Sequence, residues 1–147
     1  MTTFELEAPT SLRNAVDLLD PHDPSVRVIA GGTALMLMMK AGVFRPSRLI
    51  SLRGIEQEFS TFSSKPDGSF RISAMATLSA LEHAPELTKF APVLRQTLHT
   101  LSNVRVRNVA TIGGHLAHAD PHMDLAPVLI ALGAEVVATG RKGDRRI

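Results

Sequence analysis

The feature that most constrains the fold is a pair of glycines between a β-branched run and an apolar segment. Residues 26–30 form a short apolar run typical of a buried parallel strand. Gly31, Gly32 and Thr33 interrupt it, and the Leu- and Met-rich residues 34–41 then have helical character. Glycines at this position allow positive φ angles. Thr33 is placed to cap the following helix, and the start of a helix favours binding of a phosphate. The pattern also fits a tight strand–helix turn that needs glycine only for its geometry.

The segments around this turn predict a small βαβ-type unit. A strand is expected at 4–6, a helix capped by Ser11 at 12–19, and a further strand at 49–52. Alternating strands and helices of this kind are typical of α/β units. A change of pattern after this unit places a soft domain boundary near Gly54.

The rest of the chain has a mixed pattern. A hairpin with a turn at 65–68 is predicted first. The remaining predicted elements are helices at 77–83, 92–101 and 123–132 and a strand at 135–139. The last residues, 140–147, have the pattern of a turn followed by the start of a strand, as in an incomplete domain. We therefore expect an α+β protein with two parts, 1–54 and 55–147, the second incomplete at its C-terminus.

Composition narrows the classes of function. The chain has no Cys, so it carries neither disulfides nor a thiolate-bound zinc or iron–sulfur centre of its own. A net charge of +2 and 4% aromatic residues, without Trp or Tyr, give little support for nucleic-acid binding. No secretory signal or membrane-length apolar run is visible, and we expect a cytoplasmic protein.

The segment 115–124 concentrates three His and two Asp residues. In an extended chain, His118, Asp120, His122 and Asp124 would lie on one face, and imidazole with carboxylate suits zinc, iron or manganese. Pro121 and the preceding glycines oppose a continuous strand, and either Asp fits as a helix cap. Both a metal site and an ordinary polar loop therefore stay open.

A basic stretch precedes this segment. Arg105 and Arg107 alternate with apolar Val106 and are followed by Asn108. The pattern fits a solvated edge, or an anchor for a ligand phosphate or an acidic partner surface.

Several segments together resemble the FAD-binding subunits of the xanthine dehydrogenase and carbon monoxide dehydrogenase family, the molybdopterin dehydrogenase FAD-binding domain. Two glycine motifs in this order, about eighty residues apart, are more specific than either motif alone. The resemblance is carried by residues 28–35, 46–52, 72–77, 107–114, 117–121 and 124–125. It covers nearly the whole chain.

The resemblance implies a two-subdomain FAD-binding fold. The first motif would wrap the FAD pyrophosphate, and the second would lie along the ribityl chain and the isoalloxazine ring. The cofactor-binding residues implied are Val28, Ile29, Ala30, Gly31, Gly32, Thr33, Ala34, Leu35, Leu101, Thr111, Ile112, Gly113, Gly114, His115 and Asp124. No catalytic and no metal-binding residue is implied.

The implied function is that of an oxidoreductase subunit. Electrons would come from a molybdopterin-binding large subunit, through a [2Fe–2S] small subunit, and leave through FAD. His115 stands where Asn is usual, Ala34 where an acidic residue is common, and Arg105 where Gln is expected. Family members are nearly twice as long, so a fragment is expected. A metal-binding enzyme based on the His/Asp segment and a truncated, non-catalytic partner-docking domain remain the alternatives.

Overall fold

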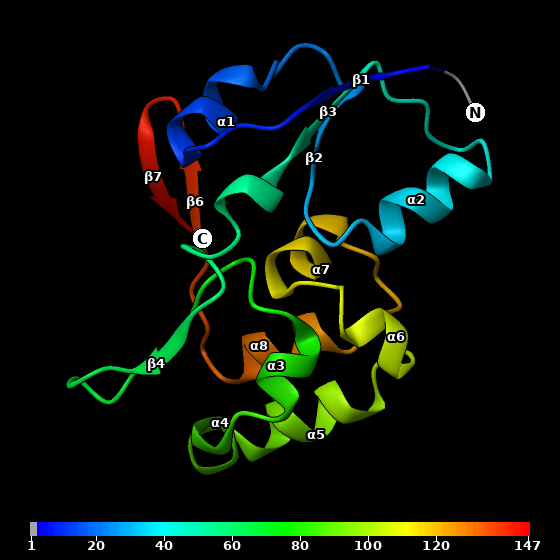
Figure 1. Cartoon of the computed structure of the whole chain (residues 1–147). Coiled ribbons are helices and arrows are strands. Elements are labelled where there is room, and N and C mark those ends of the chain that lie inside the picture. The colour runs from blue at the N-terminus through cyan, green and yellow to red at the C-terminus, as the bar shows by residue number, and fades with distance from the viewer. Residues whose placement is uncertain (1–2) are drawn as a thin grey trace. The chain divides into compact units, whose positions relative to one another are not determined.

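The computed structural model describes residues 3–147, which form two compact units (Figure 1). Unit 1 comprises the chain up to Glu56 together with Glu135–Ile147. Unit 2 comprises Gln57–Ala134. The combination of helices with parallel and antiparallel strands confirms the predicted α+β class.

Unit 1 contains a three-stranded parallel sheet in the order β1-β3-β2. Its strands are β1 (Glu5–Glu7), β2 (Val26–Ile29) and β3 (Arg48–Ser51). In the central strand β3, Leu49 is 1% exposed and Ile50 is 0% exposed. Neighbouring strand residues point to opposite faces, so both faces of β3 are covered, as is usual for a parallel sheet.

The two α-helices of unit 1 were predicted from the sequence, whereas its 3₁₀ helix was not. They are α1 (Leu12–Leu18), α2 (Thr33–Lys40) and the short 3₁₀ helix η1 (Leu52–Ile55). Ser11 Oγ accepts a hydrogen bond from the Asn14 amide at 3.1 Å, which confirms the predicted cap of α1. Ala15 of α1 packs with Val26 and Ile50 in the core of this unit.

A C-terminal hairpin completes unit 1. It consists of β6 (Val137–Gly140) and β7 (Gly143–Arg146), paired antiparallel. The guanidinium of Arg141 donates hydrogen bonds to the carbonyls of Asp17, at 2.9 Å, and Leu19, at 2.6 Å. These bonds tie the hairpin to the end of α1, so the chain from Glu135 packs with the first unit rather than with 55–134. The division into two FAD-binding subdomains stays a prediction.

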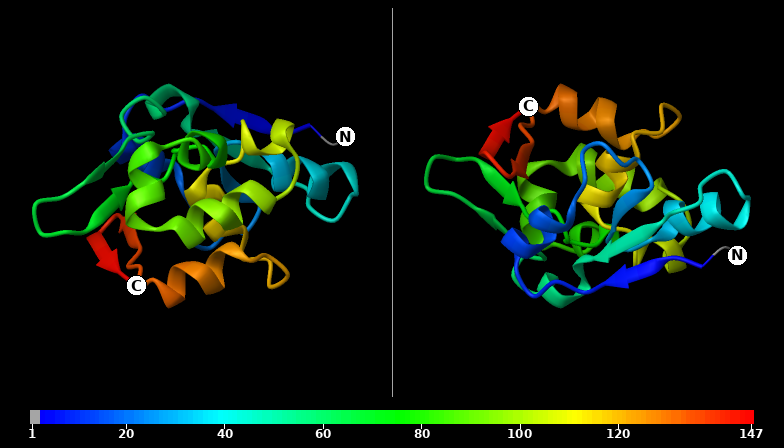
Figure 2. Two further views of the ribbon diagram at one scale, coloured as in Figure 1. Left: turned by 90° about the horizontal axis from the view of Figure 1, so that it is seen from below. Right: turned by 90° about the horizontal axis from the view of Figure 1, so that it is seen from above.

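Unit 2 begins with the predicted hairpin. Strands β4 (Phe62–Ser64) and β5 (Phe70–Ile72) pair antiparallel and extend away from the helices of this unit (Figure 2). The Phe70 ring stacks on Phe62, with 6.3 Å between centroids, and on Phe90 at 5.2 Å. Because Phe90 ends helix α4 (Pro85–Phe90), the aromatic stack holds the hairpin to the helical part.

The remaining helices of unit 2 surround its core. They are α3 (Leu78–Glu82), α5 (Pro92–Thr100), α6 (Val104–Arg107), α7 (Ile112–His118) and α8 (Leu125–Ala131). Leu81, Leu87, Leu98 and Leu125 are each 0% exposed at the centre. The sequence predicted α3, α5 and α8 but not α4, α6 and α7, which are short and owe their stability to tertiary contacts. Of the helices within 3–147, none has the length and apolarity that a membrane crossing requires.

Candidate functional site

The first predicted motif lies at the carboxyl end of β2, where ligands commonly bind in parallel sheets. Gly32 has φ +72° and occupies the N-cap of α2. This left-handed conformation explains the glycine, because a side chain there would be strained. The prediction that Thr33 caps the helix is wrong, since Thr33 is its first residue and no side chain caps it.

The start of α2 leaves backbone donors available. Within unit 1, no described carbonyl or side chain accepts a hydrogen bond from the amides of Thr33 and Ala34. The helix dipole adds positive potential at the same point. The predicted residues 28–35 are all half-buried, so this turn is neither sealed in the core nor fully exposed. The arrangement fits a phosphate group, as the sequence predicted, while Lys40 lies in the last turn of the helix.

The second motif is different, because its amides are already used. The Ile112 and Gly113 amides donate to the carbonyls of Ala76 and Ala74, each at 2.9 Å. Thr111 Oγ1 accepts from the Gly114 amide at 3.1 Å and caps α7. These bonds bring the segments 72–77 and 107–114, both of which carry the family resemblance, side by side in unit 2. The polar loop predicted in 115–124 begins later than expected, because α7 continues to His118 and the loop containing Pro121 follows it.

Close packing explains one of the two glycines in this motif. A Cβ atom on Gly113 would lie 2.7 Å from the Ala74 Cβ and 2.8 Å from the Ala74 carbonyl oxygen. Such distances are shorter than any van der Waals contact, so glycine is needed to let α7 approach the chain before α3. Gly113 is therefore a packing residue of unit 2.

His115 carries the unsatisfied polar group of this region. Its Nε2 atom is buried and has no hydrogen-bond partner among the described residues. Burial lowers the pKa of His115 below its ordinary value of 6.5; His118 acts in the same direction and Asp120 opposes it. A neutral imidazole with an unpaired buried nitrogen fits a polar group of a bound cofactor, because buried polar atoms usually have partners.

The other predicted contact residues lie on separate elements of unit 2. Leu101 is half-buried at the end of α5, where it packs against the core. Asp124 is exposed at the N-cap of α8, and its carboxylate makes no capping bond. Thr111 is 3% exposed, and its hydroxyl is engaged in the cap. The contact of each with FAD stays a prediction.

The metal alternative receives no geometric support. The residues in 115–124 do not form an extended strand, since His115 and His118 lie on α7 and Asp120 follows it. Asp120 Oδ1 accepts from the His122 amide at 2.9 Å and contacts His122 Nδ1 at 3.1 Å. Among residues 3–147, no three His, Asp or Glu side chains are grouped in a way that could hold a metal ion.

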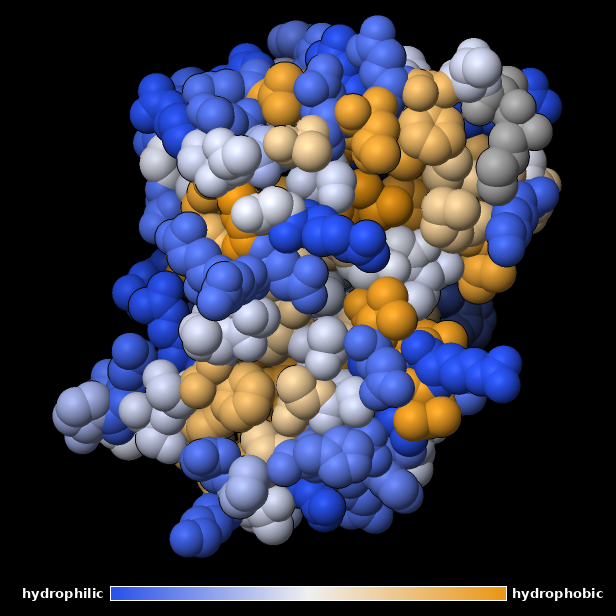
Figure 3. Space-filling view, viewed as in Figure 1, coloured by the Kyte–Doolittle hydropathy of each residue, from blue (hydrophilic) through white to orange (hydrophobic). Residues whose placement is uncertain are grey.

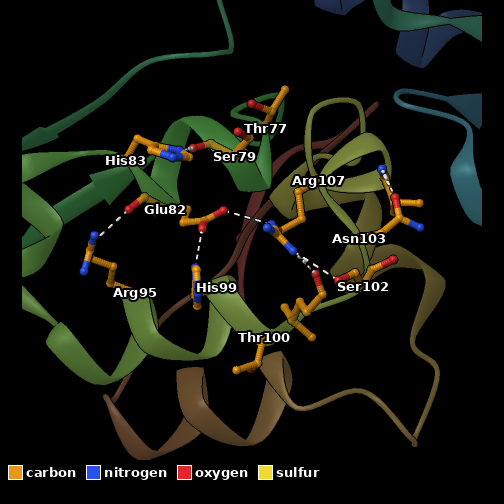
Figure 4. A network of polar contacts seen from close by, with 12 residues as sticks. Thr77, Ser79, Glu82, His83, Arg95, His99, Thr100, Ser102, Asn103 and Arg107 are labelled. Carbon is orange, nitrogen blue, oxygen red and sulfur yellow. Dashed lines mark hydrogen bonds and ion pairs between the residues drawn. The ribbon is translucent and has the colours of Figure 1, made fainter.

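Sequence reasoning missed a buried ion pair between Glu82 and Arg107 (Figure 4). The two side chains are 6% and 12% exposed, and Arg107 Nε donates to Glu82 Oε2 at 2.8 Å. His99 Nδ1 lies 2.7 Å from Glu82 Oε1 and must carry the proton, because a carboxylate only accepts. Burial alone would raise the pKa of Glu82, but the bonds and charge supplied by His99 and Arg107 outweigh it and hold the pKa below 4.5.

Comparison with known proteins places these features in a family context. Residues 2–147 match the family described as the FAD binding domain in molybdopterin dehydrogenase. The carbon monoxide dehydrogenase medium chain of Hydrogenophaga pseudoflava is 34% identical over 98% of this chain and 50% of its own length. Subunit alpha of the 6-hydroxypseudooxynicotine dehydrogenase complex of Paenarthrobacter nicotinovorans is 30% identical over 99% of this chain and 48% of its own length.

Solved structures agree with the sequence matches. Quinoline 2-oxidoreductase from Pseudomonas putida 86 superposes with a TM-score of 0.91 at 32% identity, over 99% of this chain and 50% of that one. Carbon monoxide dehydrogenase from Hydrogenophaga pseudoflava gives 0.93 at 32% identity, with the same coverage. The chain thus spans about half the length of the relatives it matches. The resemblance inferred from the sequence is confirmed.

Proposed function

The chain belongs to the family of FAD-binding domains of molybdopterin dehydrogenases, and from this membership we propose that it binds FAD as part of an electron-transfer subunit. FAD is the cofactor of the family. The observation that carries the proposal is the uncapped start of α2 behind Gly32, whose amides are oriented for an anion. In this proposal the amides of Thr33 and Ala34 hold the pyrophosphate.

The second motif has a different part in the proposal. Its backbone amides are engaged within unit 2, so it would contact FAD mainly through side chains and van der Waals surface. His115 Nε2, buried and without a hydrogen-bond partner among the described residues, is the polar atom that would pair with the flavin or its ribityl chain once FAD is bound. Bound FAD would supply the redox chemistry, while this chain would hold and orient it and tune its surroundings.

The proposal extends to the assembly. The relatives named above are subunits of dehydrogenases. These 147 residues include no Cys, so any iron–sulfur cluster that exchanges electrons with the FAD must be held by residues outside them. We therefore propose a molybdopterin-binding large subunit and a [2Fe–2S] small subunit as partners, in the cytoplasm.

The test is a titration of FAD with the purified chain, followed by the flavin's fluorescence and visible spectrum. The chain has no Trp or Tyr, so it adds no interfering emission. Gly32→Ala is the variant and Gly42→Ala is its matched control, because their φ angles are +72° and +73°. Both substitutions carry a similar backbone strain of about 1 kcal/mol, and both lie in unit 1.

We expect saturable quenching with the native chain and with Gly42→Ala. We expect Gly32→Ala to bind about tenfold more weakly, equivalent to about 1.4 kcal/mol. Because its new Cβ would also lie 3.1 Å from Ile29 Cδ1, a contact that Gly42→Ala lacks, the unfolding temperatures of both variants are measured and binding is compared below them. Equal affinity of the two variants would remove the first turn from the site. A folded native chain that does not bind FAD would contradict the proposal and favour the partner-docking alternative.

A further inference from the structure

Helix α6 exposes an apolar side chain, Val104, while it largely buries the charged side chain of Arg107. Val104 is 55% exposed, and Val109 just beyond the helix is 46% exposed, whereas the Arg107 side chain is only 12% exposed. Figure 3 shows apolar side chains on the surface over α6. Val106 of this helix packs against the core and Arg105 is exposed. Since buried charges are costly, the burial of Arg107 beside an exposed Val104 indicates a specific use for that arginine.

Arg107 joins three elements of unit 2. Its Nε atom donates to Glu82 on α3, and its Nη1 atom donates to the carbonyls of Leu101 and Ser102, each at 3.1 Å (Figure 4). Ser102 has φ +53°, a left-handed conformation that a non-glycine residue adopts at some cost. The guanidinium therefore holds a strained turn at the end of α5.

The same arginine is linked to the second glycine motif. The Ala110 amide donates to the Val106 carbonyl at 2.7 Å, and the Leu78 amide donates to the Ala110 carbonyl at 2.9 Å. Leu78 begins α3 and Glu82 ends it, so α3 contacts the α6–α7 connection through Leu78 and α6 itself through Glu82. Together with these hydrogen bonds, the ion pair connects α3 to α6 and to the residues that lead into Thr111.

We propose that the Glu82–Arg107 ion pair is a positioning device that fixes the Leu101–Ser102 turn and the Thr111–His115 segment in the geometry that receives FAD. Arg107 is then neither a solvated edge residue nor an anchor for the phosphate, the two possibilities raised by its sequence pattern. The assignment rests on the proposed function. A planar guanidinium bridges a carboxylate and two carbonyls at once, which a lysine ammonium does not reproduce.

The experiment compares Arg107→Lys with Arg105→Lys, the same substitution at an exposed position of the same helix. Amide hydrogen exchange of the chain without FAD is measured first, followed by the FAD titration and the visible spectrum. We expect exchange in 101–103 and 110–115 to rise about tenfold in Arg107→Lys, with the core of α5 unchanged. We also expect FAD affinity to fall about tenfold, with an altered flavin spectrum. Arg105→Lys should match the native chain in all three measurements.

Equal exchange in the two variants, or a uniform rise throughout unit 2, would overturn the assignment, because the ion pair would then have no selective effect on the two segments. Unchanged FAD affinity and spectrum despite local loosening would overturn it as well. If the native chain binds no FAD, the proposed function fails, and the positioning role of the ion pair fails with it. If the native chain binds FAD normally but the two variants exchange equally, only the positioning role is rejected. If Arg107→Lys does not fold, the same measurements are made on Glu82→Gln. Its control is Glu86→Gln, the same substitution at an exposed position.

Discussion

Both glycine motifs of this chain contain a Gly-Gly pair, but the two pairs have different physical roles. In the first, Gly32 adopts φ +72° and the amides of Thr33 and Ala34 have no acceptor among the described residues of unit 1. In the second, the amides of Ile112, Gly113 and Gly114 all have acceptors in unit 2. A Gly-Gly pair near the start of a helix therefore does not by itself specify an anion site. What decides is whether the backbone amides there already have hydrogen-bond acceptors.

This difference assigns separate tasks to the two motifs. The first offers backbone donors, which suit a pyrophosphate. The second offers a tightly packed surface and one side-chain atom without a hydrogen-bond partner among the described residues, His115 Nε2. This atom suits a neutral polar group. Variants in the second motif are accordingly expected to alter stability more than variants in the first.

The largest effect is expected from Gly113→Ala. The new Cβ would lie 2.8 Å from the Ala74 carbonyl oxygen, so either α7 or the chain before α3 must shift. We expect the free energy of unfolding to fall by about 3 kcal/mol, measured by urea denaturation followed by circular dichroism. A variant as stable as the native chain would remove the packing role of Gly113.

Gly133→Ala is the control for this variant. Gly133 lies in the same unit and has φ +67°, but a Cβ there meets no atom within 4 Å. Only backbone strain remains, which costs about 1 kcal/mol. Similar losses for the two variants would attribute the effect at Gly113 to general sensitivity of unit 2 rather than to the contact with Ala74.

A smaller effect separates the threonines of the two motifs. Thr111 Oγ1 caps α7, whereas Thr33 lies inside the first turn of α2 and caps nothing. We expect Thr111→Val to lower the free energy of unfolding by about 1 kcal/mol, and Thr33→Val to change it by less than about 0.5 kcal/mol. The same urea denaturation measures both. Equal losses would contradict the contrast between the motifs.

The first motif was accessible to sequence reasoning because its determinants are local. The β-branched run before Gly31 and the apolar periodicity after Thr33 lie within a few residues of the turn, and the structure places β2 and α2 there. What the sequence did not reveal was the cap, because Gly32 rather than Thr33 takes that position. The φ angle of a turn residue depends on how the flanking elements pack.

The second motif was harder because its determinants are distant in the chain. Two glycines oppose helix formation, and α7 forms because Thr111 caps it and the Ala74 and Ala76 carbonyls engage its first amides. Arg107 was equally hidden, since its partner Glu82 is 25 residues away. The composition of 115–124 was visible, but the burial of His115 Nε2 follows only from the tertiary structure.

The smallest expected effect is a pH dependence that belongs to the second motif. Burial lowers the pKa of His115 below 6.5, so the unfolded chain takes up this proton at a higher pH than the folded chain. The stability due to a neutral His115 is therefore present above pH 6.5 and is lost as the pH falls through the folded-state pKa. Glu82 acts only in a more acidic range, because its pKa lies below 4.5.

His115→Asn isolates this contribution. The urea midpoints of the native chain and the variant are compared at about pH 7.5 and about pH 5.5, with His22→Asn, an exposed position of unit 1, as the control. We expect the decrease between the two pH values to be smaller in His115→Asn than in the native chain or the control. An identical decrease in all three would mean that burial does not lower the pKa of His115 in solution.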